Sequence, residues 1–321
     1  MGAATLMTLS VFAPASIGNL NVGFDVLGLA VKPIDGTLLG DVVSIEPSHV
    51  NKLIVIGEFA NKLPGKVTDN IVWHCLVLYN QALDKEKQPI QQVQLTLDKK
   101  MPVGSGLGSS ACSVVAALVA LNEYYQQYFD EKTLLLMMGE MEAKISGSLH
   151  YDNVAPCYLG GLKLMVPDKE VICRDLPQFD DCYYVMAYPG INVSTKAARD
   201  VLPAQYSRAD AITFSQNLAT FVDACHRNDK EQAFSVLKDV IAEPYRKHLL
   251  PKFEQSKIYL EEQGHLAIGI SGSGPTLFCV CESLEKANSA ARWLQKNYLQ
   301  TDSGFVHVCQ ADLAGASKLT T

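Results

Sequence analysis

The chain has 321 residues, of which 48% are hydrophobic and 19% charged, and its formal net charge is −7 with histidine neutral. This length leaves room for two domains of roughly 100–200 residues each, and the composition excludes a globally disordered or low-complexity chain. Proteins that bind nucleic acids or membrane surfaces normally carry a basic patch, but the longest basic runs are Lys99-Lys100 and Arg246-Lys247. We therefore expect no nucleic acid and no membrane among the partners.

Nine cysteines are scattered along the chain, and their only close pair is Cys279-x-Cys281 in an apolar run. Because no Cys-x-x-Cys occurs, zinc-knuckle and thioredoxin-like sites lack support. Reduced, mostly buried thiols are expected instead, as in cytoplasmic proteins. Residues 1–10 lack the basic and long apolar segments of a secretory signal, and the longest apolar run, residues 111–121, is too short to span a bilayer.

Strand and helix patterns alternate through the first half of the chain. Strands are predicted at residues 9–13, 41–46 and 93–97, the last from apolar side chains at every second position. Helices are predicted at residues 70–83 after a cap at Asp69 or Asn70, and at residues 109–125, which are apolar on almost every face. A third helix is predicted from a cap at Asp130 to about residue 145, with Gly147 as its stop.

A polar stretch with several prolines and aspartates at residues 166–181 indicates a domain boundary. We place the first domain at residues 1–168 and the second at residues 169–321. The second is predicted to begin with a strand at 183–187 and to continue with three or four helices between 194 and 263. It ends with strands at 267–270 and 276–281, a helix at 284–297 and a strand at 305–309. Strands and helices in two packed layers indicate an α+β protein.

The strongest functional signal is the glycine-rich segment 102–111, PVGSGLGSSA, which joins a predicted strand to the buried helix. Gly104, Gly106 and Gly108 permit tight turns and close approach to a ligand. The following helix directs its free N–H groups and positive dipole end at this loop. Together with the hydroxyls of Ser109 and Ser110, this predicts a phosphate site. Neither the P-loop nor the GxGxxG pattern fits, and a plain glycine-rich turn is the alternative.

Two further glycine-rich segments could approach the same ligand. Residues 13–25 supply the amides of Asn19 and Asn21 and the carboxylate of Asp25, which could hold an ammonium group or simply occupy a turn. Residues 269–276, GISGSGPT, join two predicted strands and do not match the GxSxG elbow of hydrolases. Each segment taken alone is equally well explained as an ordinary loop.

Charged residues outside these loops supply candidates for metal and substrate binding. Glu142 lies near the C-terminal end of a predicted helix, where a carboxylate is unfavourable, and a role as Mg²⁺ ligand would explain it. A solvated helix face is the alternative. Residues 150–153, HYDN, lack the ligand spacing of a zinc site. Arg199 and Arg246 could each clamp a carboxylate through two hydrogen bonds, although each alone is more often a surface arginine.

Together these segments resemble the three motifs of the GHMP small-molecule kinases, named for galactokinase, homoserine kinase, mevalonate kinase and phosphomevalonate kinase. The phrases PASIGNLNVGFDVLG, PVGSGLGSSACS, SGSLHYDNVAP and YPGINVSTKAAR are most similar to the homoserine kinase branch. The resemblance implies an N-terminal nucleotide-binding domain like the second domain of a ribosomal protein, and a ferredoxin-like C-terminal domain. It also implies phosphorylation of L-homoserine by ATP with Mg²⁺, as in threonine biosynthesis.

The resemblance further assigns the nucleotide site. Asn70, Ile71 and Val72 would lie near the adenine, and Ser110 and Glu142 would hold Mg²⁺. The loop around the ATP phosphates would consist of Pro102, Val103, Gly104, Ser105, Gly106, Leu107, Gly108, Ser109, Ser110, Ala111 and Cys112.

The same resemblance implies a homoserine pocket lined by Asn19, Asp25, His150, Asn153, Thr195, Arg199 and Arg246. Asp25 would accept the ammonium, the two arginines would bind the carboxylate, and Asn153 would hydrogen-bond the hydroxyl that is phosphorylated. Several relatives have an aspartate base where this chain has Asn153, and the adjacent Asp152 is expected to point elsewhere. We therefore predict in-line transfer without a dedicated base, because phosphoryl transfer depends mainly on positioning and charge stabilisation.

Three alternatives remain open. The first is a GHMP kinase for another alcohol, such as mevalonate or a sugar, although the paired arginines together with Asp25 favour a zwitterionic amino acid. A catalytically silent sensor of the same fold would not need Ser110 and Glu142, and a dehydrogenase would have to bind NAD(P)H. A cytoplasmic homodimer is expected from the family.

Overall fold

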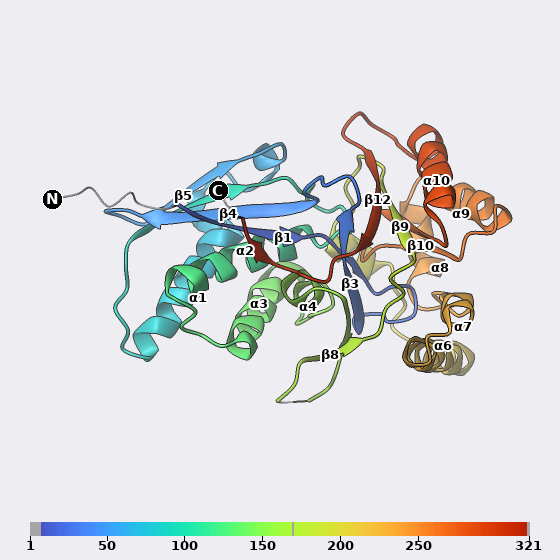
Figure 1. Ribbon diagram of the computed structural model, residues 1–321, viewed down its shortest axis with the longest axis horizontal. Helices are drawn as coiled ribbons and strands as arrows, with labels where there is room; N and C mark the ends of the chain where they lie inside the picture. The colour runs from blue at the N-terminus through green and yellow to red at the C-terminus, as the bar shows by residue number, and fades with distance from the viewer. Residues whose placement is uncertain (1–7, 169, 320–321) are drawn as a thin grey trace.

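The computed structural model describes residues 8–168 and 170–319, so most of the segment argued not to be a secretory signal lies outside the described residues. The described chain forms two sheets, one in each half of an elongated molecule (Figure 1). The first sheet has the order β13-β1-β4-β6-β5 and is antiparallel except between β5 and β6. Its strands are β1 (Leu9–Pro14), β4 (Gly40–Pro47), β5 (Lys52–Ile56), β6 (Val93–Asp98) and β13 (Ser317–Lys318).

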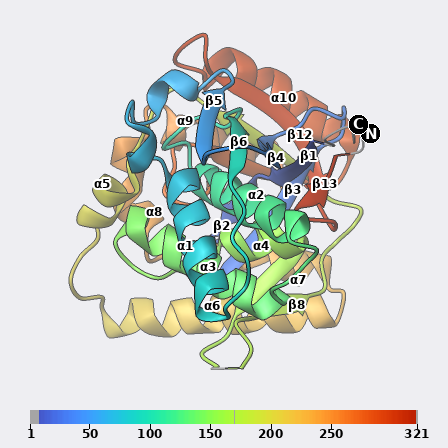
Figure 2. The same cartoon turned by 90° about the vertical axis from the view of Figure 1, so that its left-hand side faces the viewer.

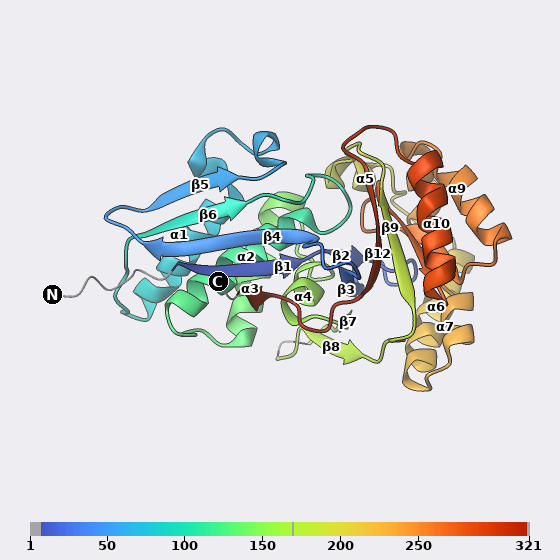
Figure 3. The same cartoon turned by 45° about the horizontal axis from the view of Figure 1, so that its top comes forward.

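Four helices cover one face of this sheet (Figures 1 and 3). They are α1 (Ile71–Lys85), α2 (Ser109–Tyr124), α3 (Glu131–Ser146) and α4 (Val154–Leu159). Helix α2 packs directly on β1 and β4, and α1, α3 and α4 pack against α2 in turn. Its alanines and valines allow this close approach, and its residues are buried from Ala111 to Asn122. The rest of the fold therefore holds the N-terminus of α2 in a fixed place.

The second sheet has the order β10-β11-β9-β12-β3-β7-β8, with β2 paired to β3, and all of its pairs are antiparallel. Its strands are β2 (Ser16–Gly18), β3 (Leu27–Pro33), β7 (Leu162–Met165), β8 (Cys173–Leu176), β9 (Tyr183–Tyr188), β10 (Ala267–Ile270), β11 (Leu277–Cys281) and β12 (Phe305–Ala311). The sheet joins both halves of the chain, because β3 pairs with β12. The boundary proposed at residues 168 and 169 remains a prediction.

The remaining helices lie in the second half of the chain. Helices α9 (Phe253–Glu262) and α10 (Leu284–Asn297) pack on the second sheet, at the end of the molecule opposite α1 (Figures 1 and 3). Helix α6 (Arg208–His226) is seen along its whole length in Figure 2. The shorter helices are α5 (Thr195–Asp200), α7 (Lys230–Ser235) and α8 (Glu243–Arg246), and three 3₁₀ turns occupy Ala60–Lys62, Val67–Asp69 and Lys247–Leu249.

The structure confirms the α+β class and most of the predicted elements. Asn70 and Asp130 cap α1 and α3 through their side chains, and α3 ends at Gly147. The sequence did not predict β2, β3, β5, β7, β8, β13 or α4; several are very short, and β3 is buried on both faces and shows no alternation. Residues 194–263 form five α-helices, more than the three or four expected. Among the described residues, no helix has both the length and the apolar character needed to cross a membrane.

Candidate active site

A cavity of about 430 Å³ lies where the three glycine-rich segments meet. It brings together most of the residues that the sequence singled out. Those in its wall are Asn19, Asp25, Asn70, Ile71, Val103, Gly104, Ser105, Gly106, Gly108, Ser109, Ser110, Glu142, His150, Asn153, Thr195, Arg199 and Arg246. The nucleotide and substrate residues predicted separately therefore share one chamber.

Five residues predicted for the nucleotide site have side chains in the protein interior rather than in this wall. They are Val72, Pro102, Leu107, Ala111 and Cys112. Val72 lies in the first turn of α1, and Ala111 and Cys112 lie in the first turn of α2, and both helices turn these side chains towards the core. Cys112, for example, donates from Sγ to the Pro14 carbonyl over 3.3 Å. Their place in the nucleotide site stays a prediction, and in this structure any contact with a ligand would come from their backbone.

The phosphate-loop candidate has the backbone shape that its glycines predicted. Gly104, Gly106 and Gly108 have φ angles of 68°, 79° and 69°, in the left-handed region that disfavours other residues. Gly108 is the N-cap of α2, and no side chain caps the helix there. The first N–H groups of α2 therefore remain available to an anion at the cavity wall.

The segment 269–276 holds this loop in place. Thr276 donates to the Ser105 carbonyl from its N–H over 3.1 Å and from its hydroxyl over 2.7 Å. Ser271 donates from its hydroxyl to the Gly106 carbonyl over 2.7 Å. A Cβ on Gly106 would lie 2.4 Å from the Ser271 carbonyl oxygen, so this contact requires glycine. The segment is thus more than an ordinary hairpin, since it braces the phosphate loop and also lines the cavity with Gly272 and Ser273.

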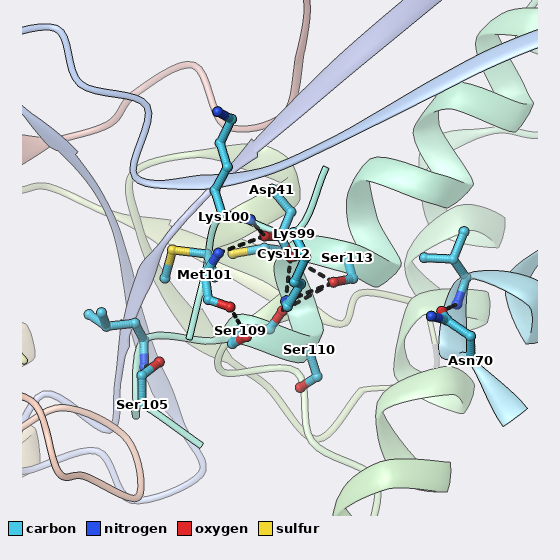
Figure 4. A network of polar contacts seen from close by, with 12 residues as sticks. Asp41, Asn70, Lys99, Lys100, Met101, Ser105, Ser109, Ser110, Cys112 and Ser113 are labelled. Atoms are coloured by element: carbon cyan, nitrogen blue, oxygen red, sulfur yellow. Dashed lines mark hydrogen bonds and ion pairs between the residues drawn. The ribbon is translucent and has the colours of Figure 1, made fainter. Parts of the chain in front are cut away.

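A buried ion pair that the sequence did not predict anchors the loop next to the N-terminus of α2 (Figure 4). Lys99 Nζ lies 2.5 Å from Asp41 Oδ2 and also donates to the Ser109 carbonyl over 2.8 Å and to the Ser113 hydroxyl over 3.0 Å. The other Asp41 oxygen accepts the N–H groups of residues 100 and 101, each over 3.0 Å. Asp41 lies at the start of β4 and Lys99 directly follows β6, and no local sequence pattern pairs two residues so far apart in the chain.

Ser110 and Glu142, the two predicted Mg²⁺ ligands, lie in contact with each other. Ser110 Oγ donates to Glu142 Oε1 over 2.8 Å. Neighbouring ligands in an octahedral Mg²⁺ site at about 2.0–2.1 Å lie roughly 2.9 Å apart, so these two oxygens fit adjacent positions. Burial raises the pKa of Glu142, and the Ser110 hydrogen bond and the charge of Lys99 partly offset this. A cation bound beside Glu142 would stabilise the ionised form of this buried carboxylate.

Among the residues predicted to bind substrate, Asp25 and Arg199 are bonded to each other. The Arg199 guanidinium donates to the two Asp25 oxygens over 2.8 and 3.2 Å, and His150 Nδ1 lies 3.4 Å from Asp25 Oδ2. Asn19 fixes this aspartate, accepting its N–H over 2.9 Å and donating to the Gly272 carbonyl over 3.1 Å. The predicted ammonium and carboxylate partners therefore neutralise one another in this structure.

Arg246 is buried, which overturns its interpretation as a surface residue. Only 3% of it is exposed. Its Nε donates to the Ala198 carbonyl and one terminal nitrogen donates to the Gly272 carbonyl, both over 2.9 Å. The Phe24 ring lies 5.2 Å from the guanidinium carbon of Arg246 and 5.6 Å from that of Arg199. Both cations are thus held beside one aromatic face at the cavity.

Asp152 and Asn153 both line the cavity, so the expectation that Asp152 points elsewhere is wrong. Asn153 donates from Nδ2 to Asp152 Oδ2 over 3.0 Å and accepts the Ser16 hydroxyl at Oδ1 over 2.9 Å. Burial raises the pKa of Asp152 to about 7, and Asp25 and Glu142 add to the shift. The rule that neighbouring side chains diverge applies to strands, whereas these residues form the turn before α4.

Comparison with known proteins agrees with this geometry. The family model described as "GHMP kinases N terminal domain" matches residues 70–161, and "GHMP kinases C terminal" matches residues 221–300. Homoserine kinase from Cytophaga hutchinsonii is 32% identical over 99% of this chain and 99% of that chain, with a TM-score of 0.89.

More distant structures share the fold. L. major mevalonate kinase in complex with R-mevalonate is 16% identical over 97% of this chain and 99% of that chain, with a TM-score of 0.68. Streptococcus pneumoniae phosphomevalonate kinase is 12% identical over 98% and 99%, with a TM-score of 0.67. The chain belongs to the GHMP kinase family and is a kinase that phosphorylates a small molecule with ATP.

Proposed function

We propose that this kinase phosphorylates the side-chain hydroxyl of L-homoserine to give O-phospho-L-homoserine. The observation that carries the proposal is the set of opposite charges in the cavity that also contains the phosphate loop: Arg199 and Arg246 with Asp25. A zwitterionic amino acid presents one carboxylate and one ammonium, and this set offers partners for both. The 32% identity to homoserine kinase from Cytophaga hutchinsonii supports the same substrate.

The Asp25–Arg199 pair prepares the site for such a substrate. Because the two side chains neutralise each other, both charged groups are held in position before a ligand binds. A bound amino acid replaces it, because its ammonium takes Asp25 and its carboxylate takes Arg199 and Arg246 through charge-assisted hydrogen bonds. Mevalonate has a carboxylate but no ammonium, so it would leave Asp25 without a cation.

On the nucleotide side, the first N–H groups of α2 would bind the phosphates, and Asn70 and Ile71 would lie beside the adenine. Ser110 and Glu142 would hold Mg²⁺, which when bound neutralises phosphate charge. Lys99 lies at the same wall and would keep the loop in position, because three hydrogen bonds fix its ammonium group.

Asn153 would orient the accepting hydroxyl. An amide has two N–H donors and two acceptor lone pairs, and Asn153 uses one donor on Asp152 and one lone pair on Ser16. One donor and one lone pair remain for a substrate hydroxyl. An amide is not a base, so the hydroxyl proton would leave late in a transfer that depends on positioning.

The test is ADP release by the full chain with ATP, Mg²⁺ and, in turn, L-homoserine, L-serine, L-threonine and R-mevalonate. We expect homoserine to have the highest kcat/KM, and serine, which is one methylene shorter, to be about 10–200-fold poorer. A higher kcat/KM for R-mevalonate than for L-homoserine would contradict the proposed substrate. Binding of ATP and homoserine without any turnover would instead indicate a sensor.

Three sequence-based expectations stay predictions beside this proposal. They are the homodimer, the cytoplasmic location and the division at residues 168 and 169. The proposed reaction depends on none of them, because every residue named above comes from one chain.

A further inference from the structure

A second cluster of reactive side chains lies in the other half of the molecule. It consists of Cys279 and Cys281 on β11 and His265 in the turn between α9 and β10. None of the three lines the active-site cavity. No local sequence pattern joins them, because the chain contains no Cys-x-x-Cys and the histidine comes from a different element.

The topology of the sheet brings these three side chains together. Residues two apart on a strand point to the same face, and Cys279 and Cys281 both belong to the core that lies under α9 and α10. Strand β10 pairs with β11, Ala267 lying opposite Val280, so the turn that carries His265 ends beside Cys281. The arrangement is therefore fixed by backbone pairing.

The spacing of the ligand atoms matches a tetrahedral metal site. The two sulfurs are 3.8 Å apart, Cys281 Sγ is 3.4 Å from His265 Nδ1, and all three atoms lie within 4.8 Å of one another. Around a tetrahedral Zn²⁺ with bonds of about 2.3 Å to sulfur and 2.0–2.1 Å to nitrogen, two sulfurs lie about 3.8 Å apart and a sulfur and a nitrogen about 3.6 Å. The three ligand atoms would therefore need only small movements to reach the geometry of a tetrahedral Zn²⁺ site.

We propose that His265, Cys279 and Cys281 form a binding site for one Zn²⁺ ion. Two thiolates and a neutral imidazole balance its charge of +2, which suits an interior position. Binding would form two Zn–S bonds and one Zn–N bond, and each thiol would release its proton to solvent. Sulfur ligands disfavour Mg²⁺ and Ca²⁺, which prefer oxygen, and Cu⁺ with the same ligands would leave a net negative charge in the core.

A cleft gives the ion access and leaves room for a fourth ligand. It measures about 480 Å³ and is lined by His265, Glu282 and Lys286 among others. His265 is half-buried, whereas both cysteines are fully buried, so an ion would enter past the imidazole and water could complete its shell.

A disulfide is a poorer use of the two cysteines. Residues two apart on an extended strand have Cα atoms about 6.7 Å apart, at the upper limit for a disulfide. All nine cysteines are free in the structure. Metal binding uses the side chains where they already lie, without bending β11.

The experiment titrates the reduced, chelator-treated full chain with Co²⁺, a coloured substitute for Zn²⁺, with Mg²⁺ in excess to fill oxygen-ligand sites. We expect a thiolate-to-Co²⁺ charge-transfer band that saturates at one equivalent and is abolished by added Zn²⁺. His265→Gln should weaken Co²⁺ binding at least about tenfold, the smallest effect usual for residues that support a metal. Cys279→Ala should remove much of the band.

The matched control is Cys309→Ala. This cysteine is equally buried in the same sheet, on β12, and its loss should leave the band unchanged. If Cys279→Ala misfolds, Co²⁺ binding by His265→Gln still tests the proposal, because His265 is only half-buried. The proposal is overturned if the wild type shows no thiolate band, if His265→Gln binds Co²⁺ as tightly as the wild type, or if only Cu⁺ binds.

Discussion

The two charged regions of the active site differ in how completely their polar groups are satisfied. Beneath the phosphate loop, Lys99 uses all three of its N–H donors, and both oxygens of Asp41 accept hydrogen bonds. At the substrate end, the buried Nε of Arg199 has no partner in the described chain, and Asp152 lies close to other carboxylates. The hydrogen bonds of the first region fix its conformation, whereas the second region contains polar groups that a bound ligand could hydrogen-bond.

The largest effect is expected from breaking the satisfied region. Lys99→Met would leave the buried Asp41 carboxylate without its cation, which typically costs about 3–5 kcal/mol. We expect the free energy of unfolding, measured with denaturant, to fall by this amount. Nucleotide affinity should fall with it, since the same ammonium group holds the Ser109 carbonyl.

A double variant separates charge from packing in that experiment. Lys99→Met combined with Asp41→Asn removes both charges but keeps an oxygen for the N–H groups of residues 100 and 101. It should recover part of the lost stability. If the double variant is as unstable as the single one, the cost comes from lost packing and not from the unpaired carboxylate.

The next largest effect should come from Glu142, which we propose as a Mg²⁺ ligand. Glu142→Ala removes a carboxylate that contacts Ser110, and we expect kcat to fall about 100–1,000-fold, as when other groups that stabilise transition-state charge are removed. The measurement is ADP release at saturating Mg²⁺. Glu140→Ala, two residues earlier on the exposed side of α3, is the control. Near-normal kcat in Glu142→Ala would remove this residue from the mechanism.

The difference between the two regions also explains what the sequence could predict. The phosphate loop and α2 depend on local features, namely glycines with positive φ followed by a long apolar run, and both were predicted. The anchor under the loop joins Asp41 to Lys99, 58 residues apart, and no local pattern reports such a pair.

The same limit applies to the rest of the fold and site. Strand β3 pairs across the two halves of the chain and is buried on both faces, so it shows no period of two. Asp152 was discounted by a strand rule in a segment that forms a turn. The family resemblance supplied Ser110 with Glu142 and the cavity-lining arginines, which spacing alone left undecided.

A tenfold to hundredfold effect is expected from removing one arginine of the substrate end. Hydrogen bonds to charged groups contribute about 1.5–3 kcal/mol, so Arg199→Leu should raise the KM for homoserine by about one to two decades. The KM for ATP should stay constant, and the exposed Arg208→Leu is the control. An unchanged homoserine KM would contradict a role for Arg199 in carboxylate binding.

The smallest expected effect is a gain in stability, because Asp152→Asn removes a buried carboxylate that lies close to other carboxylates. The raised pKa of Asp152, about 7 against 3.8 for the free group, means that the folded state binds its proton more tightly than the unfolded chain. Wild-type stability therefore falls as pH rises through this interval.

Asp152→Asn avoids the buried charge and can still accept a hydrogen bond from Asn153. We therefore expect its free energy of unfolding at pH 8 to exceed that of the wild type by roughly 1 kcal/mol, and we expect this difference to shrink towards pH 5. The exposed Asp302→Asn is the control and should leave the free energy of unfolding unchanged at both pH values. A gain independent of pH would show that ionisation of Asp152 is not its source.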